Sequence, residues 1–132
     1  MRIAKRFVDE MIQHAKDDAP FEACGFLAGK NSTAAKRYPL TNIKRSPVLY
    51  EADPNEHFRA QNDMEAEGIE LIAIYHSHTR SAAYPSTTDV ERAMYPEAVY
   101  LIVSLRDPSN PDVRGFRIID QKDVSEVKLE IT

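Results

Sequence analysis

The sequence predicts a single α/β domain, spanning residues 1–132, with a mixed β-sheet flanked by helices. Three observations indicate this fold class. Helical and strand patterns alternate along most of the chain, and strands close it. Two strand segments, residues 69–75 and 98–105, are apolar almost throughout, as in a sheet that is covered on both faces. The 132 residues contain no repeat, low-complexity tract or internal linker, and this length suits one domain.

The chain begins with an amphipathic helical pattern. Apolar residues recur at every fourth position among charged ones, and Pro20 disfavours helical backbone in the residue before it, so the helix should end near there. The recurring residues are Ile3, Phe7, Met11 and Ala15. Three strands are expected next, at residues 21–31, at residues 34–43 and, with a weaker pattern, at residues 46–52. The first of them should end in a turn at Gly29–Asn31.

A second helix has clear start and stop signals. Asp53 is a candidate cap, Pro54 suits the first helical position, and Glu56 would complete a capping box. The helix should stop at Gly68, since glycine readily adopts the left-handed backbone that ends helices.

The second half of the chain alternates again and then ends in strands. The apolar strand at residues 69–75 leads into the segment IYHSHTRSAAYPSTTD, residues 74–89, whose first two residues are the last two of the strand. Residues 86–96 predict a short helix ended by Pro96, and residues 98–105 predict another buried strand. After a turn, two final strands are expected at residues 113–120 and 127–131.

Composition limits the partners of the chain. The formal net charge is −4, which gives no general basic footprint for nucleic acid or an anionic membrane, although Lys36–Arg37 and Lys44–Arg45 leave a local basic patch open. Cys24 is the only cysteine, so no internal disulfide is expected. No apolar run is long enough to span a bilayer, and the N-terminus does not resemble a signal peptide, so a cytoplasmic location is expected.

Two of the four histidines, His76 and His78, stand one residue apart at the end of the buried strand. In extended backbone such residues point to the same face, so both imidazoles can aim at one point. A catalytic zinc uses three protein ligands plus a water, and Asp89, 11 residues further on, could supply the third ligand if the loop folds back.

A purely structural role for this segment stays open. A His-x-His pair is often incidental, and Ser86 to Asp89 also match the Ser-x-x-acid capping box that opens a helix. The capping and ligand roles of Asp89 do not exclude each other. The remaining histidines, His14 and His57, lie on expected helices and are expected at the surface.

The segment HSHTRSAAYPSTTD resembles the zinc-site signature of the JAMM/MPN+ (Mov34/MPN/PAD-1) metalloproteases, and FEACGFLAG resembles the strand that carries their catalytic glutamate. The order of elements also agrees over roughly residues 3–105. This resemblance implies a curved mixed sheet similar to that of cytidine deaminases. One difference is that Thr79 stands where the family commonly has proline.

The resemblance also implies roles for single residues. His76, His78 and Asp89 would bind one Zn²⁺ per chain, Glu22 would be the general acid/base, and Ser86 would hydrogen-bond the tetrahedral intermediate. Cys24, beside the glutamate strand, could be a redox-sensitive thiol or a small core residue. Gly25 and Gly29 are expected to serve close packing and a turn.

The implied activity is that of a short, free-standing prokaryotic zinc peptidase or isopeptidase. Its substrate would be the Gly-Gly tail of a ubiquitin-like or sulfur carrier protein, for example one that carries a cysteine, bound as an added strand. The segment at residues 44–50 could line the groove for this tail or be an ordinary edge strand. A non-catalytic scaffold and a hydrolase of small peptides or cell-wall fragments are the alternatives. The oligomeric state, with a homodimer among the options, stays open.

Overall fold

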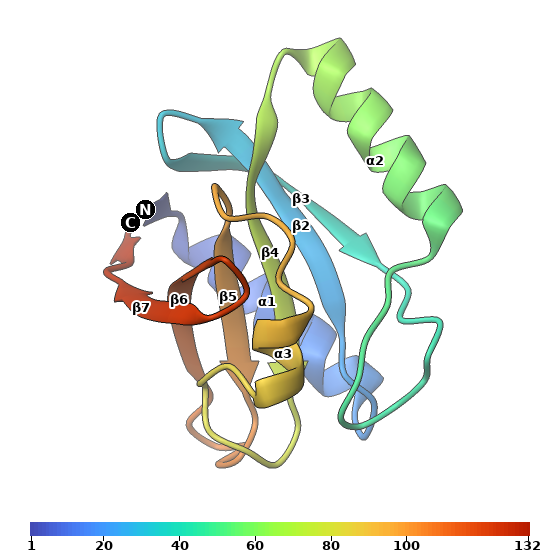
Figure 1. Cartoon of the computed structure of the whole chain (residues 1–132), viewed down its shortest axis with the longest axis vertical. Coiled ribbons are helices and arrows are strands. Elements are labelled where there is room, and N and C mark those ends of the chain that lie inside the picture. Colours follow the sequence, from blue (N-terminus) through green and yellow to red (C-terminus); the bar gives the residue numbers. More distant parts are fainter.

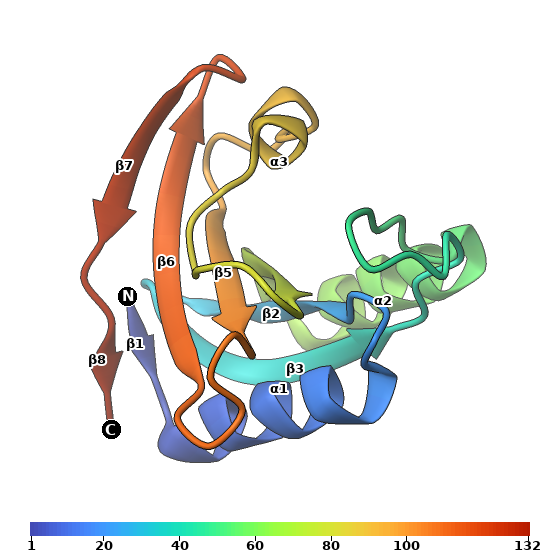
Figure 2. The same ribbon diagram turned by 90° about the horizontal axis from the view of Figure 1, so that it is seen from below.

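The computed structural model describes all residues 1–132 and contains one eight-stranded mixed sheet with three helices (Figure 1). The strand order is β7-β6-β5-β4-β2-β3-β1-β8. The elements, in chain order, are β1 (Arg2–Ile3), α1 (Lys5–Asp18), β2 (Cys24–Lys30), β3 (Thr33–Leu40), α2 (Pro54–Glu67), β4 (Glu70–His78), α3 (Thr87–Glu91), β5 (Val99–Ser104), β6 (Asp112–Ile119), β7 (Asp123–Val127) and β8 (Glu130–Ile131). The predicted α/β class with a curved mixed sheet is confirmed, and Figure 2 shows the curl of the sheet.

The central strands explain why the sequence looks apolar there. β4 pairs antiparallel with β2 and parallel with β5, so it lies in the middle of the sheet. Alternate β4 side chains enter two different cores: Ala73 and Tyr75 join the core that contains α1, whereas Ile74 joins the core that contains α2 residues. Helices therefore cover both faces of β4. None of the three helices is long and apolar enough to cross a bilayer.

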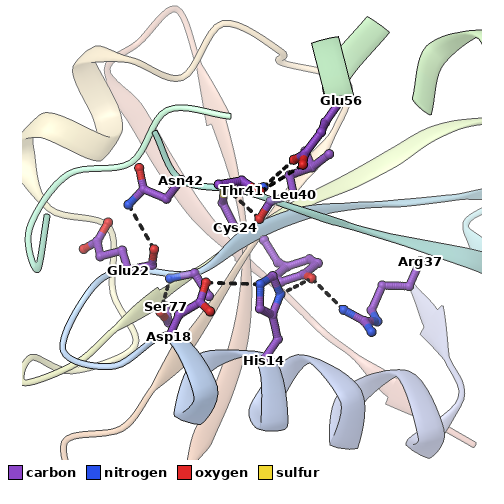
Figure 3. A network of polar contacts seen from close by, with 12 residues as sticks. His14, Asp18, Glu22, Cys24, Arg37, Leu40, Thr41, Asn42, Glu56 and Ser77 are labelled. Atoms are coloured by element: carbon purple, nitrogen blue, oxygen red, sulfur yellow. Dashed lines mark hydrogen bonds and ion pairs between the residues drawn. The ribbon is translucent and has the colours of Figure 1, made fainter. Parts of the chain in front are cut away.

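The helix signals are mostly confirmed. The four recurring apolar residues of the first segment are all buried, although Ile3 belongs to β1 rather than to α1. Asp53 caps α2 by accepting hydrogen bonds from the backbone of Asn55 and Glu56, and Gly68 ends α2 in the left-handed conformation. The expected capping box is wrong in one respect, because the Glu56 carboxylate accepts hydrogen bonds from Thr41 instead (Figure 3).

The expected strand at residues 46–52 is also wrong. This part of the chain is a loop with one isolated bridge, Asn42 to Ala52. The Asn42 side chain explains the difference, since its amide donates to the Leu49 carbonyl (3.0 Å) and its oxygen accepts from the Glu51 amide (3.0 Å). A buried side chain thus pairs backbone groups that a strand would pair with a neighbouring strand.

Two further boundaries differ from the prediction. α3 ends at Glu91 rather than near Pro96, and the backbone amide of Tyr95 donates to the Tyr100 hydroxyl (3.0 Å) instead of to a helical carbonyl. The strand expected at residues 127–131 is divided between the last residue of β7 and the short β8. β8 pairs in parallel with β1, so the first and last strands of the chain lie side by side (Figure 2).

Two glycines of β2 allow close approaches of neighbouring groups. A Cβ on Gly25 would lie 2.4 Å from the ring of Tyr75, which is buried and bonded through its hydroxyl to Arg37 (2.9 Å) and His14 (2.7 Å). His14 therefore belongs to a partly buried polar network and is not a plain surface residue (Figure 3). A Cβ on Gly29 would lie 1.9 Å from the Thr33 carbonyl, beside the turn. The close packing expected at these glycines is confirmed, but Gly29 belongs to β2, and the turn lies at Asn31 and Ser32 rather than at Gly29–Asn31.

Candidate metal centre

β4 carries both histidines of the His-x-His pair within the strand itself, not after it. Strand periodicity places His76 and His78 on the face that carries Ile74, opposite to Tyr75. Ser77, between them, points the other way, and its hydroxyl accepts a hydrogen bond from the Ala23 amide (2.8 Å, Figure 3). The strand thus aims the two imidazoles together and uses the intervening residue to hold the neighbouring chain.

The two imidazoles and the Asp89 carboxylate converge. Nε2 of His76 lies 3.2 Å from Nε2 of His78, and Oδ2 of Asp89 lies 3.1 Å and 2.9 Å from these two nitrogens. Both histidines are buried. The three ligand atoms fall within 4.8 Å of one another, and no other group of three such residues does so. Two imidazole nitrogens and one carboxylate oxygen at such distances fit a zinc ion.

The tautomer of His78 fits metal binding. Its Nδ1 lies 2.8 Å from the Ala82 carbonyl oxygen, which can only accept, so Nδ1 carries the hydrogen. In the neutral ring the lone pair is then on Nε2, the atom that faces the other two groups. A hydrogen bond from the outer ring nitrogen to a carbonyl is the usual partner of a metal-binding histidine.

Asp89 has both of the roles that its sequence position allows. Its backbone amide donates to Ser86 Oγ (3.0 Å), while its Oδ2 accepts from the Ser86 amide (2.9 Å), which is a complete capping box for α3. Burial disfavours the charged carboxylate, but the contacts with His76 and His78 outweigh burial and hold the pKa of Asp89 well below its usual range. The cap therefore orients a charged carboxylate towards the histidines.

The capping role gives a stability prediction. Replacing Ser86 with alanine should lower the free energy of unfolding of the metal-free protein by about 0.5–2 kcal/mol, because the Asp89 amide loses its acceptor. Thr87→Ala, one residue further along the same helix, is the matched control and should change it by less than about 0.5 kcal/mol. Denaturant unfolding measures both values. Equal stability of the two variants would show that Ser86 does not cap the helix.

Glu22 lies just before β2, on the segment held by Ser77 and Asn42. The Asn42 amide donates to the Glu22 carbonyl (3.0 Å), as Figure 3 shows. The Glu22 side chain is buried, and its Oε1 has no hydrogen-bond partner in the chain. Burial, and then the charge of Asp89, raise the pKa of Glu22 to about 8, while His78 acts in the opposite direction. A buried carboxylate without a hydrogen-bond partner, whose pKa is shifted by the charges of two of the three ligand groups, is unusual for a purely structural residue.

Three residues that support the site were not identified from the sequence. The Tyr50 ring stacks on the His76 ring, with centroids 4.5 Å apart and planes 19° from parallel. Asn42 holds both the Glu22 backbone and the loop that carries Tyr50. Ser77 could have been suspected from its place between the histidines. Tyr50 ends the segment at residues 44–50 that could line the substrate groove, but nothing in the spacing of Tyr50 or Asn42 relates them to the histidines.

Cys24 behaves as a core residue. It is a buried free cysteine, and burial raises the pKa of its thiol to about 12. A thiol with so high a pKa has little thiolate at neutral pH and is a poor nucleophile. The packing interpretation of Cys24 is therefore favoured over the redox-sensitive one.

Comparison with known proteins agrees with this geometry. The family model described as prokaryotic homologs of the JAB domain matches residues 4–119. The chain is 45% identical over 115 residues to the CysO-cysteine peptidase of Mycobacterium tuberculosis, covering 86% of this chain and 79% of that protein. It is 40% identical over 103 residues to the desampylase of Haloferax volcanii, covering 73% and 74% respectively.

Solved structures support the same assignment. A solution structure of a protein from Desulfitobacterium hafniense matches with a TM-score of 0.90 and 34% identity, covering 100% of this chain and 93% of that one. A crystal structure of a JAB1/MPN domain protein from Archaeoglobus fulgidus matches in fold, with a TM-score of 0.65 at 19% identity over 99% and 98% of the two chains. The chain belongs to the prokaryotic JAB branch of the JAMM/MPN metallopeptidase family.

Proposed function

We propose that this chain is a zinc-dependent peptidase that hydrolyses the bond after the Gly-Gly end of a ubiquitin-like or sulfur carrier protein. The observation that carries the proposal is the convergence of His76, His78 and Asp89 beside the buried, unpaired carboxylate of Glu22. A non-catalytic scaffold would need neither a ligand set of this geometry nor an unpaired buried carboxylate. The lone buried thiol of Cys24 is compatible with a cytoplasmic location.

The metal would be held by His76, His78 and Asp89. A zinc ion bound there supplies Lewis-acid chemistry, because it lowers the pKa of a water molecule to about 7 and polarises a carbonyl oxygen. The chain itself contributes the proton transfers. The ionised carboxylate of Glu22, a form that a cation bound by the three ligands would favour, takes a proton at Oε1 from the attacking water and later delivers it to the leaving amine.

Ser86 contributes a hydrogen-bond donor. Its Oγ accepts from the Asp89 amide and donates to no group of the chain, so the hydroxyl hydrogen is free. We assign this hydrogen to the carbonyl oxygen of the scissile bond, where negative charge develops during attack. The cap that orients Asp89 thus also fixes the position of the donor oxygen.

The substrate class is suggested by the relatives. Their names, CysO-cysteine peptidase and desampylase, describe enzymes that act on carrier conjugates. A protein of Thermus thermophilus described as a probable TtuB-protein conjugate cleaving protease is also similar, at 32% identity over 128 residues, covering 96% of this chain and 82% of that protein. An extended carrier tail fits the same chemistry, since its scissile bond is open to attack.

The metal content tests the proposed site. We expect about one zinc per chain in the wild type, and much less in His78→Ala, because a three-ligand site loses one donor. His57→Ala is the matched control, since His57 lies on α2 outside the ligand set and its loss should leave the zinc content unchanged. Elemental analysis after gentle purification gives these values. A wild-type protein that is metal-free and also fails to bind added zinc would contradict the proposal.

A further inference from the structure

A small cavity adjoins the ligand set. We call it the side pocket: a space of about 170 Å³ between the loop before α2 and the α3 region, with Asp89 in its wall. This is smaller than the roughly 300–1,000 Å³ of sites for drug-sized ligands. Aromatic and aliphatic side chains form much of the lining, among them Phe26, Tyr50, Ile74 and Tyr100. The side pocket therefore suits a small, partly apolar group that lies next to the reacting bond.

One cationic residue is part of this lining, the exposed Arg92. Arg92 is the only lysine or arginine among the lining residues, and its guanidinium makes no ion pair or hydrogen bond within the chain. The two carboxylates of the lining are engaged elsewhere: Asp89 contacts His76 and His78, and Glu51 lies 3.8 Å from Lys44. A free guanidinium beside an apolar space favours a ligand with a carboxylate, which it can bind through two parallel hydrogen bonds.

The chemistry of the substrate indicates which group enters the side pocket. The two glycines before the scissile bond have no side chains and cannot fill an apolar cavity. The residue after that bond can fill it, and it differs between two kinds of conjugate. A single amino acid added to the carrier has its α-carboxylate close to the scissile bond, whereas an isopeptide link to lysine presents an uncharged aliphatic chain there.

Building on the proposed function, we infer that the side pocket binds the amino acid that is released, and that Arg92 pairs with its α-carboxylate. Arg92 is then a specificity-determining residue that favours a carrier extended by one amino acid over an isopeptide conjugate. Hydrolysis breaks the amide bond between the last glycine and that amino acid. The oxygen of water ends on the glycine carboxyl group, and the leaving nitrogen gains a proton and departs as an amine.

Three forms of one substrate test this inference with the zinc-loaded full chain. They are a carrier protein extended past Gly-Gly by cysteine with a free carboxylate, the same protein with a C-terminal amide, and a Gly-Gly tail joined to the side-chain amine of a lysine peptide. We expect kcat/KM for the free acid to exceed that for the amide by roughly 10–100-fold, the size of a charge-assisted hydrogen bond. Arg92→Ala should abolish this preference by slowing the free acid alone. Arg59→Ala, an exposed arginine of α2 outside the pocket lining, should keep it.

The outcomes separate the two proposals. Equal cleavage of the acid and the amide by the wild type, or an undiminished preference in Arg92→Ala, would overturn the role of Arg92 and leave the peptidase standing. No cleavage of any form by zinc-loaded wild type would overturn the peptidase and the side-pocket assignment with it. A second readout needs no activity: in the metal-free protein, a Gly-Gly-Ser peptide should shift NMR signals of the side-pocket residues more than its amide does. Equal shifts from both peptides would contradict the inference.

Discussion

Glu22→Gln should slow hydrolysis by ~10²–10⁴-fold, the usual contribution of a positioned acid/base group, and leave the zinc content almost unchanged. Glutamine keeps the shape of the side chain but cannot accept and return the proton. The melting temperature should not fall, because burial already disfavours the charged form of Glu22 and raises its pKa to about 8. Glutamine is uncharged like the protonated carboxyl that burial favours, so the substitution places no new charge in the folded state.

Glu65→Gln is the matched control for this variant. Glu65 is exposed on α2 and forms no ion pair, so its substitution makes the same change in charge away from the site. Both variants and the wild type should be compared at equal zinc content, with a carrier protein extended past Gly-Gly by one cysteine as substrate. If Glu22→Gln released cysteine as fast as the wild type, Glu22 would have no part in catalysis.

Much of this fold could be predicted because local signals agreed with the final packing. The four-residue spacing in the first segment, the Asp53–Pro54 start and the Gly68 stop of α2 each act within a few neighbouring residues. The loop at residues 41–53 could not be predicted in this way. Its backbone is held by Asn42, a side chain that bonds groups seven and nine residues away, and such pairing leaves no period in the sequence.

The same difference applies to the site. The His-x-His spacing and the Ser-x-x-Asp motif are local, so the sequence indicated that His76, His78 and Asp89 could meet, and the structure brings their ligand atoms together. The catalytic role of Glu22 was predicted only through the family resemblance, because the chain contains many acidic residues and their spacing does not single out this one. Tyr50, on the loop before α2, stacks on His76, and Arg92, at the end of α3, lines the side pocket; both relations are visible only in three dimensions.

Removal and return of the metal test the central claim, a zinc-dependent peptidase, most directly. Wild-type protein is incubated with the carrier that ends in Gly-Gly-Cys, and the release of cysteine is followed by mass spectrometry. We expect release by the zinc-loaded protein, loss of release to the background level after a chelator strips the zinc, and recovery when zinc is added back. Release that continues undiminished after the zinc has been removed would contradict the account. So would a zinc-loaded protein that leaves uncut this carrier and a panel of isopeptide and short-peptide substrates.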